Sequence, residues 1–167
     1  MDVKDAISTR RSIRRYVNKE IPHKVLEQLL EAMQLAPSAS NLQRWKVIVV
    51  TDADLKRKLV SVSGNQKFVG QCSAYLVGVT EPGAHYSAID MTIALDHLTL
   101  RAVELGLGTC WIGDYETEKV KAILRIPKER DVAICMTLGY PIQNPAARKR
   151  KKLPELFRLN VWNGVWR

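Results

Sequence analysis

The segment "MTIALDHLTLRAVEL", residues 91–105, limits the possible folds of this chain more than any other stretch. It is long, mostly apolar and followed by Gly106 and Gly108, and glycine is common just beyond a helix end. Ser87 and Asp90 precede it with the spacing of a capping box, which predicts a helix start. A helix with so little polar surface is stable only when other elements cover it. We therefore expect a central buried helix.

Short apolar runs and amphipathic stretches supply the covering elements. "WKVIVVT" (45–51) and "SAYLVGVT" (73–80) are rich in β-branched residues, which is typical of strands buried on both faces. Between Pro22 and Pro37, helical spacing joins Val25, Leu26, Leu29, Leu30 and Met33. Further helices are expected at 52–64 and 116–124, and a further strand at 131–141. The expected order is helix, helix, strand, helix, strand, helix, strand, helix, strand, in one domain spanning residues 1–167.

Composition and cysteine usage indicate a cytoplasmic protein without a membrane segment. The longest apolar runs, "WKVIVV" and "AYLVGV", fall far short of the roughly 20 residues that a membrane helix needs. The acidic start "MDVKD" is unlike a signal peptide. Cys72, Cys110 and Cys135 are widely spaced and form no C-x-x-C pair, which favours buried free thiols over disulfides or a zinc site.

The positive charge is concentrated in two short clusters. "RRSIRR" (10–15) and "RKRKK" (148–152) together hold nine basic residues, which equals the net charge of +9, so the remaining 17 basic residues balance the 17 acidic ones. A non-specific nucleic-acid binder more often spreads its Lys and Arg along a face with exposed aromatics. The clusters could instead converge on one phosphate group, or be solvated charge runs that favour solubility.

Several common catalytic motifs are absent from the sequence. It contains no G-x-S-x-G, no G-x-x-x-x-G-K-[ST], no H-E-x-x-H, and no strand followed by G-x-G-x-x-G. His23, His85 and His97 lack ligand spacing, so we assign no metal.

The stretch "LAPSASNLQRW" (35–45) connects the predicted helix at 22–35 to the first predicted strand. Ser38, Ser40, Asn41 and Gln43 provide the hydroxyl and amide groups that can bind the edge of a planar heterocycle. The same residues are also typical of Asx and Ser turns, which would give them a structural role.

Four motifs in order resemble the nitroreductase family of flavin enzymes. "TRRSIRRY" is similar to the family's R-R-S-x-R-x-[FY], and "PSASNLQRW" to its P-S-x-x-N-x-Q-P-W. "IDMTIALDHLTLRAVELGLGTCWIG" resembles the central helix and the G-L-G-x-x-W-[IL]-G that follows it, and "LGYPIQNPAARKRKKLPELF" resembles the closing segment. The chain departs from the family at Arg44, where proline is usual, and in its short sequence between Gly64 and Ile89.

The resemblance implies an α+β fold, with a central mostly antiparallel sheet surrounded by helices and a C-terminal arm exchanged in a homodimer. The arm would be residues 155–167, whose "LFRLNVWNGVWR" is too apolar to leave in water. Packing on its own subunit is the alternative.

The resemblance also implies an FMN site. The expected phosphate and ribityl contacts are Arg10, Arg11, Ser12 and Arg14, joined by Arg148, Arg150 and Lys152 from the second cluster. The expected ring contacts are Pro37, Ser38, Ala39, Ser40, Asn41 and Gln43, together with backbone groups of Trp111, Ile112 and Gly113. Because the flavin carries the chemistry, no side chain is assigned as a catalytic acid or base.

The implied reaction transfers hydride from NADH or NADPH through FMN to a small electron-poor acceptor such as a nitroaromatic or quinone. Two alternatives remain from the sequence. The chain could be a basic nucleic-acid-binding module, or a flavin-binding protein without turnover.

Overall fold

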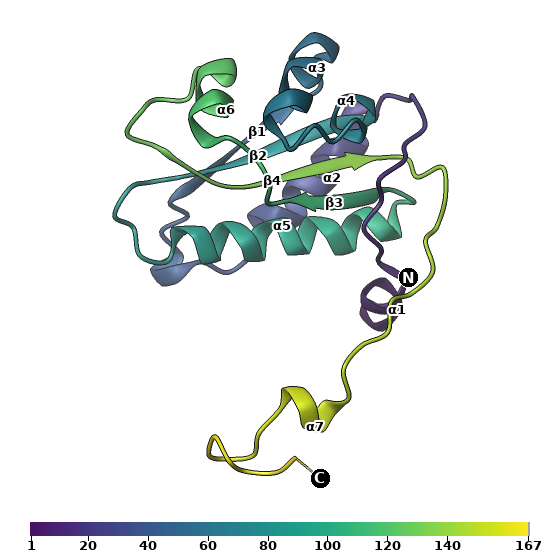
Figure 1. The fold of residues 1–167 in the computed structure, drawn as a ribbon, viewed down its shortest axis with the longest axis vertical. Helices are drawn as coiled ribbons and strands as arrows, with labels where there is room; N and C mark the ends of the chain where they lie inside the picture. Colours follow the sequence, from purple (N-terminus) through teal and green to yellow (C-terminus); the bar gives the residue numbers. More distant parts are fainter. Residues whose placement is uncertain (167) are drawn as a thin grey trace.

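The computed structural model of the chain describes residues 1–166, arranged as a sheet between two layers of helices (Figure 1). The antiparallel sheet has the order β1-β2-β4-β3. Its strands are β1 (Trp45–Val50), β2 (Ala74–Thr80), β3 (Gly108–Ile112) and β4 (Asp131–Gly139). The helices are α1 (Val3–Thr9), α2 (His23–Gln34), α3 (Ala53–Val62), α4 (Phe68–Gln71), α5 (Ser87–Glu104), α6 (Thr117–Leu124) and α7 (Leu153–Leu156), with a 3-10 turn, η1, at Ala39–Asn41. The predicted order of nine elements is confirmed, with the short α4, η1 and α7 in addition.

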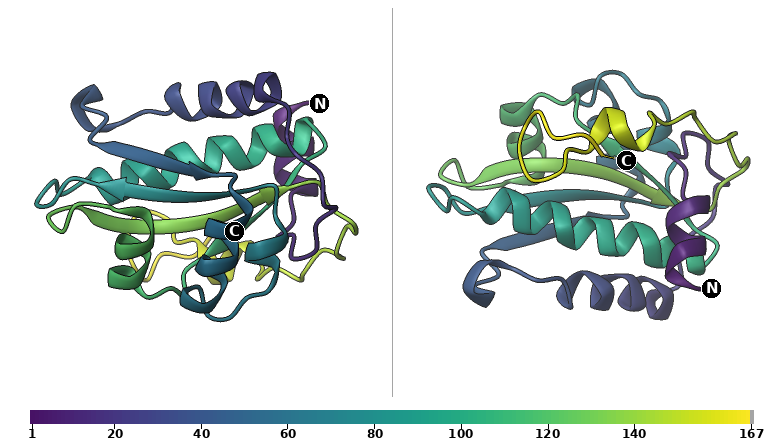
Figure 2. Two further views of the ribbon diagram at one scale, coloured as in Figure 1. Left: turned by 90° about the horizontal axis from the view of Figure 1, so that it is seen from above. Right: turned by 90° about the horizontal axis from the view of Figure 1, so that it is seen from below.

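The two faces of the sheet carry separate apolar cores. Helices α2 and α5 cover one face, and α3, α4 and α6 cover the other (Figure 2). Leu95 and Leu98 of α5 are completely buried against α2 and the sheet, so the prediction of a central buried helix is confirmed. The apolar face predicted for α2 is also confirmed, since Leu29 and Met33 are buried in the same cluster.

The predicted burial of the strands is confirmed for β2 and wrong for β1. All seven residues of β2 are buried, because β1 and β4 flank it and helices cover both its faces. β1 has only Val50 buried and pairs with β2 alone, so it is an edge strand. The apolar pattern of "WKVIVV" carries no information on which neighbours the strand will have.

The predicted capping box at the start of α5 is wrong. Ser87 and Asp90 both lie inside the helix, which Tyr86 precedes without a side-chain cap. The Ser87 hydroxyl donates to the Ala84 carbonyl at 2.8 Å, and the Asp90 carboxylate accepts from the backbone N–H of Ala39. Asp90, which the local pattern assigned to the helix cap, therefore makes a tertiary contact with Ala39 instead.

The C-terminal segment extends away from the body of the subunit (Figure 1). From Ala146 to Trp166 nearly every residue is exposed, and Trp162 is 86% exposed. The contact between the rings of Phe157 and Trp166, 6.1 Å apart, lies within the segment itself. The alternative that the arm packs on its own subunit therefore finds no support in residues 1–166.

None of the helices within residues 1–166 is both long and apolar enough to cross a membrane.

The buried thiols and phenols of the core should make the protein sensitive to alkali. Burial raises the pKa of Cys72 from 9.0 to about 11, that of Cys135 from 9.0 to about 12, and that of Tyr115 from 10.0 to about 12. Because the unfolded chain releases these protons first, stability is fully present below about pH 9 and is lost as the pH rises further.

We expect the free energy of unfolding to fall by about 3 kcal/mol between pH 7 and pH 10, at about 1.4 kcal/mol per pKa unit for the two cysteines. Urea unfolding at a series of pH values measures this change. The decrease should be smaller in Cys135→Ala. A urea midpoint that stays constant up to pH 10 would show that these groups titrate normally.

Candidate functional site

The first basic cluster is held against β3 by backbone pairing. Ser12 forms an isolated parallel bridge with Thr109, and the N–H of Ile13 donates to the Thr109 carbonyl at 2.9 Å. This approach requires a glycine at 108, since a Cβ there would lie 2.3 Å from Cγ1 of Ile13. Ile13 is buried while Arg14 is exposed, so the pairing turns the arginine outward.

Tyr16 anchors the far end of the same segment. Its hydroxyl donates to the Ile13 carbonyl at 2.7 Å and lies 2.7 Å from the Thr137 hydroxyl. The backbone bridge between Tyr16 and Pro141 brings the chain beyond β4 alongside. The two basic clusters, more than 130 residues apart in sequence, consequently meet in space.

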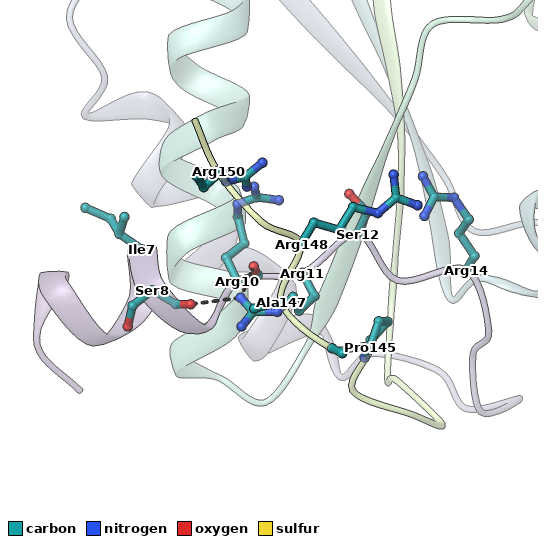
Figure 3. A pocket seen from close by; sticks show the side chains of 11 residues that line it. Ile7, Ser8, Arg10, Arg11, Ser12, Arg14, Pro145, Ala147, Arg148 and Arg150 are labelled. Atoms are coloured by element: carbon teal, nitrogen blue, oxygen red, sulfur yellow. Dashed lines mark hydrogen bonds between the residues drawn. The ribbon is translucent and has the colours of Figure 1, made fainter. Parts of the chain in front are cut away.

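The residues from both clusters line one cavity of about 510 Å³ (Figure 3). Its lining residues are Ile7, Ser8, Arg10, Arg11, Ser12, Arg14, Pro145, Ala146, Ala147, Arg148 and Arg150. No carboxylate is among them, and within residues 1–166 none of the five arginines forms an ion pair. Five like charges around one cavity repel one another unless an anion binds there. Lys152, which the sequence analysis included, does not line it.

Arg11 provides a direct test of whether a phosphate fits this cavity. One terminal nitrogen, Nη1, donates to the carbonyls of Ser8 and Arg10, both at 2.8 Å. Its Nε is buried and has no hydrogen-bond partner among residues 1–166. A buried unpaired donor costs about 1–3 kcal/mol, and guanidinium groups match phosphate oxygens in geometry and charge. The donor set therefore fits the phosphate of FMN.

The Cys110 thiol is close enough to Arg10, Ser12 and Arg14, three residues that line the cavity, for them to affect its pKa. Burial raises the pKa of Cys110, while the charge of Arg14, a hydrogen bond with Ser12 and the charge of Arg10 act in the opposite direction.

Within residues 1–166, no group of three or more His, Cys, Asp or Glu side chains is arranged to hold a metal ion.

The segment Pro37–Gln43, here called the ring loop, has an unusual backbone. Ser40, Asn41 and Gln43 have φ values of 50°, 56° and 49°, in the left-handed region that non-glycine residues rarely adopt. Side chains stabilise this shape from within: the Ser38 hydroxyl accepts from the Gln43 N–H at 3.2 Å, and the Gln43 amide donates to Asn41 Oδ1 at 3.0 Å. These residues therefore form the turn that the sequence analysis gave as their alternative, structural role. Ser40, Asn41 and Gln43 are also exposed.

The ring loop and the arginine cavity lie at opposite ends of the same subunit. Asp90, near the start of α5, touches the ring loop, whereas Glu104 at the end of α5 pairs with the N-terminal amine that leads into α1. The helical rise from Asp90 to Glu104, 14 positions later, spans about 20 Å. Within residues 1–166, a single chain therefore does not bring the predicted phosphate and ring contacts together.

The predicted contacts at the end of β3 are also separate from the cavity. Trp111 is half-buried and Ile112 is buried. Gly113 is exposed, and a Cβ built on it meets nothing within 4 Å. None of the three lines the arginine cavity.

Two contacts, one of the ring loop and one of the residue that follows it, were missed by sequence reasoning. Asp90 binds Ala39, as described above. Arg44, at the position where the family usually has proline, lies 3.9 Å from Glu81, which also pairs with Arg130 at 3.2 Å. The sequence signal for Asp90 was present but was assigned to a helix cap.

Known proteins resemble this chain in both sequence and fold. A sequence model of the Nitroreductase family matches residues 7–69 and 60–140. An NADH dehydrogenase of Thermus thermophilus is 31% identical, over 97% of this chain and 96% of its own length.

Solved structures agree with the sequence matches. The NADPH:FMN oxidoreductase from Vibrio harveyi complexed with NAD+ superposes with a TM-score of 0.90 at 25% identity, covering 98% of this chain and 79% of that one. An FMN-dependent nitroreductase from Clostridium difficile has a TM-score of 0.86 at 26% identity and covers 95% and 99%. The α+β fold implied by the motifs is thereby confirmed, and the chain belongs to the nitroreductase family.

Proposed function

We propose that this protein is an FMN-dependent oxidoreductase that takes hydride from NADH or NADPH and reduces a small electron-poor acceptor, such as a nitroaromatic or a quinone. The observation that carries the proposal is a cavity lined by five arginines that form no ion pair in the described part of a chain of the nitroreductase family. The buried Nε of Arg11, which has no hydrogen-bond partner in that part, supports it. The relatives give no support to the nucleic-acid alternative, and the arginines line a concave cavity rather than an extended stripe.

The arginine cavity would bind the phosphate of FMN. In this role Arg10, Arg11, Arg14, Arg148 and Arg150 donate charge-assisted hydrogen bonds, each contributing about 1.5–3 kcal/mol. The Ser12 hydroxyl adds a neutral donor. Lys152 lies two residues beyond Arg150 and is exposed, so its proposed part is limited to adding positive charge to the second cluster.

The ring loop and the end of β3 would contact the flavin ring. The exposed side chains of Ser40, Asn41 and Gln43 present donors and acceptors to the edge of the ring, with Pro37, Ser38 and Ala39 shaping the loop behind them. The backbone of Trp111, Ile112 and Gly113 would approach the ring on the other side. Bound FMN supplies the hydride and electron transfer itself, and the chain supplies binding, orientation and an open stacking face.

The separation of the two groups of contacts is explained if the protein is a homodimer. In a two-fold dimer the ring loop of one subunit can face the arginine cavity of the other, which gives two equivalent flavin sites. The exposed apolar arm at 155–166 supports this arrangement, because its side chains find no cover on their own subunit. We propose that each arm packs on the partner subunit.

We also propose a cytoplasmic location. Cys72, Cys110 and Cys135 are all buried free thiols, which suits a reducing compartment.

The proposal is tested by measuring turnover of the purified, FMN-loaded protein with NADH and with NADPH across a panel of nitroaromatics, quinones and free flavins. We expect reduction of at least one class of acceptor, and no reaction when FMN is removed. A preparation that neither acquires a flavin spectrum with added FMN nor oxidises either nicotinamide would refute the proposed function.

A further inference from the structure

We infer that Asp90 is a positioning residue that fixes the ring loop in its binding conformation. Both of its carboxylate oxygens lie 3.2 Å from the backbone nitrogen of Ala39, which donates to them. Asp90 is buried, with 6% of its surface exposed. The inference rests on the proposed function for the role of the loop at the flavin ring, but the contact itself is independent of it.

The hydrogen bond from the Ala39 N–H to Asp90 links the ring loop to helix α5. The other hydrogen bonds of residues 37–43 within the described chain stay inside the segment or join it to Trp45, which begins β1. These local bonds can shape the loop, but they cannot fix its place relative to α5. The Asp90 contact does so, because α5 is packed into the central core.

The conformation that Asp90 holds is costly for the isolated segment. Each non-glycine residue with a positive φ costs on the order of 1–3 kcal/mol, less for Asn, and the ring loop contains three of them. A strained loop keeps its shape only when its surroundings determine it. Ala39 is the first residue of η1 and directly precedes Ser40 and Asn41. Its hydrogen bond to Asp90 therefore lies next to the first residues with a positive φ.

The surroundings of Asp90 leave its side chain available to the ring loop. It lies in the first turn of α5, where the unpaired N–H groups and the helix dipole stabilise negative charge. Within residues 1–166 no Lys, Arg or His pairs with it. Its hydrogen-bonding capacity is therefore directed to the loop rather than to a structural ion pair.

The consequence for function follows from what the loop exposes. With the Ala39 N–H turned inward to Asp90, the side chains of Ser40, Asn41 and Gln43 are left at the surface. Without the hydrogen bond between Asp90 and Ala39, the loop would sample other conformations, and FMN would have to reorder the loop on binding. FMN affinity should then fall although no group in contact with FMN has changed.

The test uses the full-length chain with and without FMN, comparing the wild type with Asp90→Ala, Asp90→Asn and a control, Asp96→Ala. Asp96 is an exposed acid on the same helix, and within the described chain its carboxylate accepts a hydrogen bond from Thr99 alone. Hydrogen exchange of the Ala39 amide, followed by NMR, reports the contact directly. The fluorescence of FMN during titration gives its dissociation constant.

In Asp90→Ala we expect exchange at Ala39 to become at least about tenfold faster and the FMN dissociation constant to rise about tenfold, the equivalent of one lost hydrogen bond. Asp90→Asn keeps one acceptor oxygen and should restore part of both values, while Asp96→Ala should match the wild type. If Asp90→Ala does not fold, Asp90→Asn is compared with the wild type and should show smaller changes in the same direction.

Unchanged exchange at Ala39 in the Asp90 variants would overturn the inference. Faster exchange with unchanged FMN affinity would overturn the link between the loop and the flavin. A wild-type protein that does not bind FMN at all would instead refute the proposed function, and the exchange measurement would still report on the contact.

Discussion

Replacing Arg14 by alanine should weaken FMN binding by roughly 10- to 150-fold, because it removes a charge-assisted contact of about 1.5–3 kcal/mol. Arg14 is exposed, lines the cavity and makes no ion pair in the described chain, so its loss should leave folding unaffected. The loss of affinity should be the same for a flavin analogue with an altered ring, since the contact is with the phosphate. Equilibrium titration with FMN and with the analogue measures both values.

Arg15 provides a matched control for this substitution. It is the adjacent arginine and is also exposed, but its Nη1 donates to Gln143 Oε1 at 3.3 Å and it does not line the cavity. Arg15→Ala should therefore bind FMN as the wild type does. Asn41→Ala should leave the phosphate contacts intact and change the flavin potential or the rate of hydride transfer instead. Wild-type affinity in Arg14→Ala would show that the arginine cavity is not the phosphate site.

Deleting residues 156–167 should convert the proposed dimer to monomers and lower the flavin content together. The deleted segment includes Trp162 and Trp166, and each tryptophan can bury about 150–250 Å², equivalent to about 4–6 kcal/mol at 25 cal/mol per Å². Light scattering gives the mass, and absorbance after gel filtration gives the bound flavin. Circular dichroism establishes that the truncated chain is folded.

The double variant Trp162→Ala, Trp166→Ala separates the side chains from the backbone of the arm. It should raise the dimer dissociation constant and lower flavin content in the same direction as the deletion. A folded, truncated protein that remains dimeric with full FMN would remove the arm from the account. Dimers without flavin would instead show that the arm serves the site but not the assembly.

The elements that could be predicted from the sequence are those determined by local periodicity. Leu29 and Met33 follow the 3.6-residue period that buries α2, and the continuous apolar run of β2 reflects its place inside the sheet. The same reasoning failed for β1, because its pairing on one side only is a property of the assembled sheet. It failed for Asp90 because the acid binds a loop 51 residues away.

For the candidate site too, some features could be predicted from the sequence and others depend on the tertiary structure. The resemblance identified the arginines that line the cavity, but the sequence could not show that Arg14 and Arg148 meet, since this depends on the bridges of Ser12 with Thr109 and of Tyr16 with Pro141. The distance between the ring loop and the cavity could not be predicted either. It follows from the length of α5, which places the two groups of contacts at opposite ends of one subunit.

The central claim is that the chain binds FMN and reduces it with a nicotinamide cofactor. Anaerobic rapid mixing of the FMN-loaded protein with NADPH, and separately with NADH, tests this claim most directly through the absorbance of the oxidised flavin. We predict that the absorbance bleaches with at least one of the two donors, much faster than that of free FMN under the same conditions. Flavin that stays bound and oxidised with both donors would contradict the account and identify the protein as a flavin binder without reductase activity.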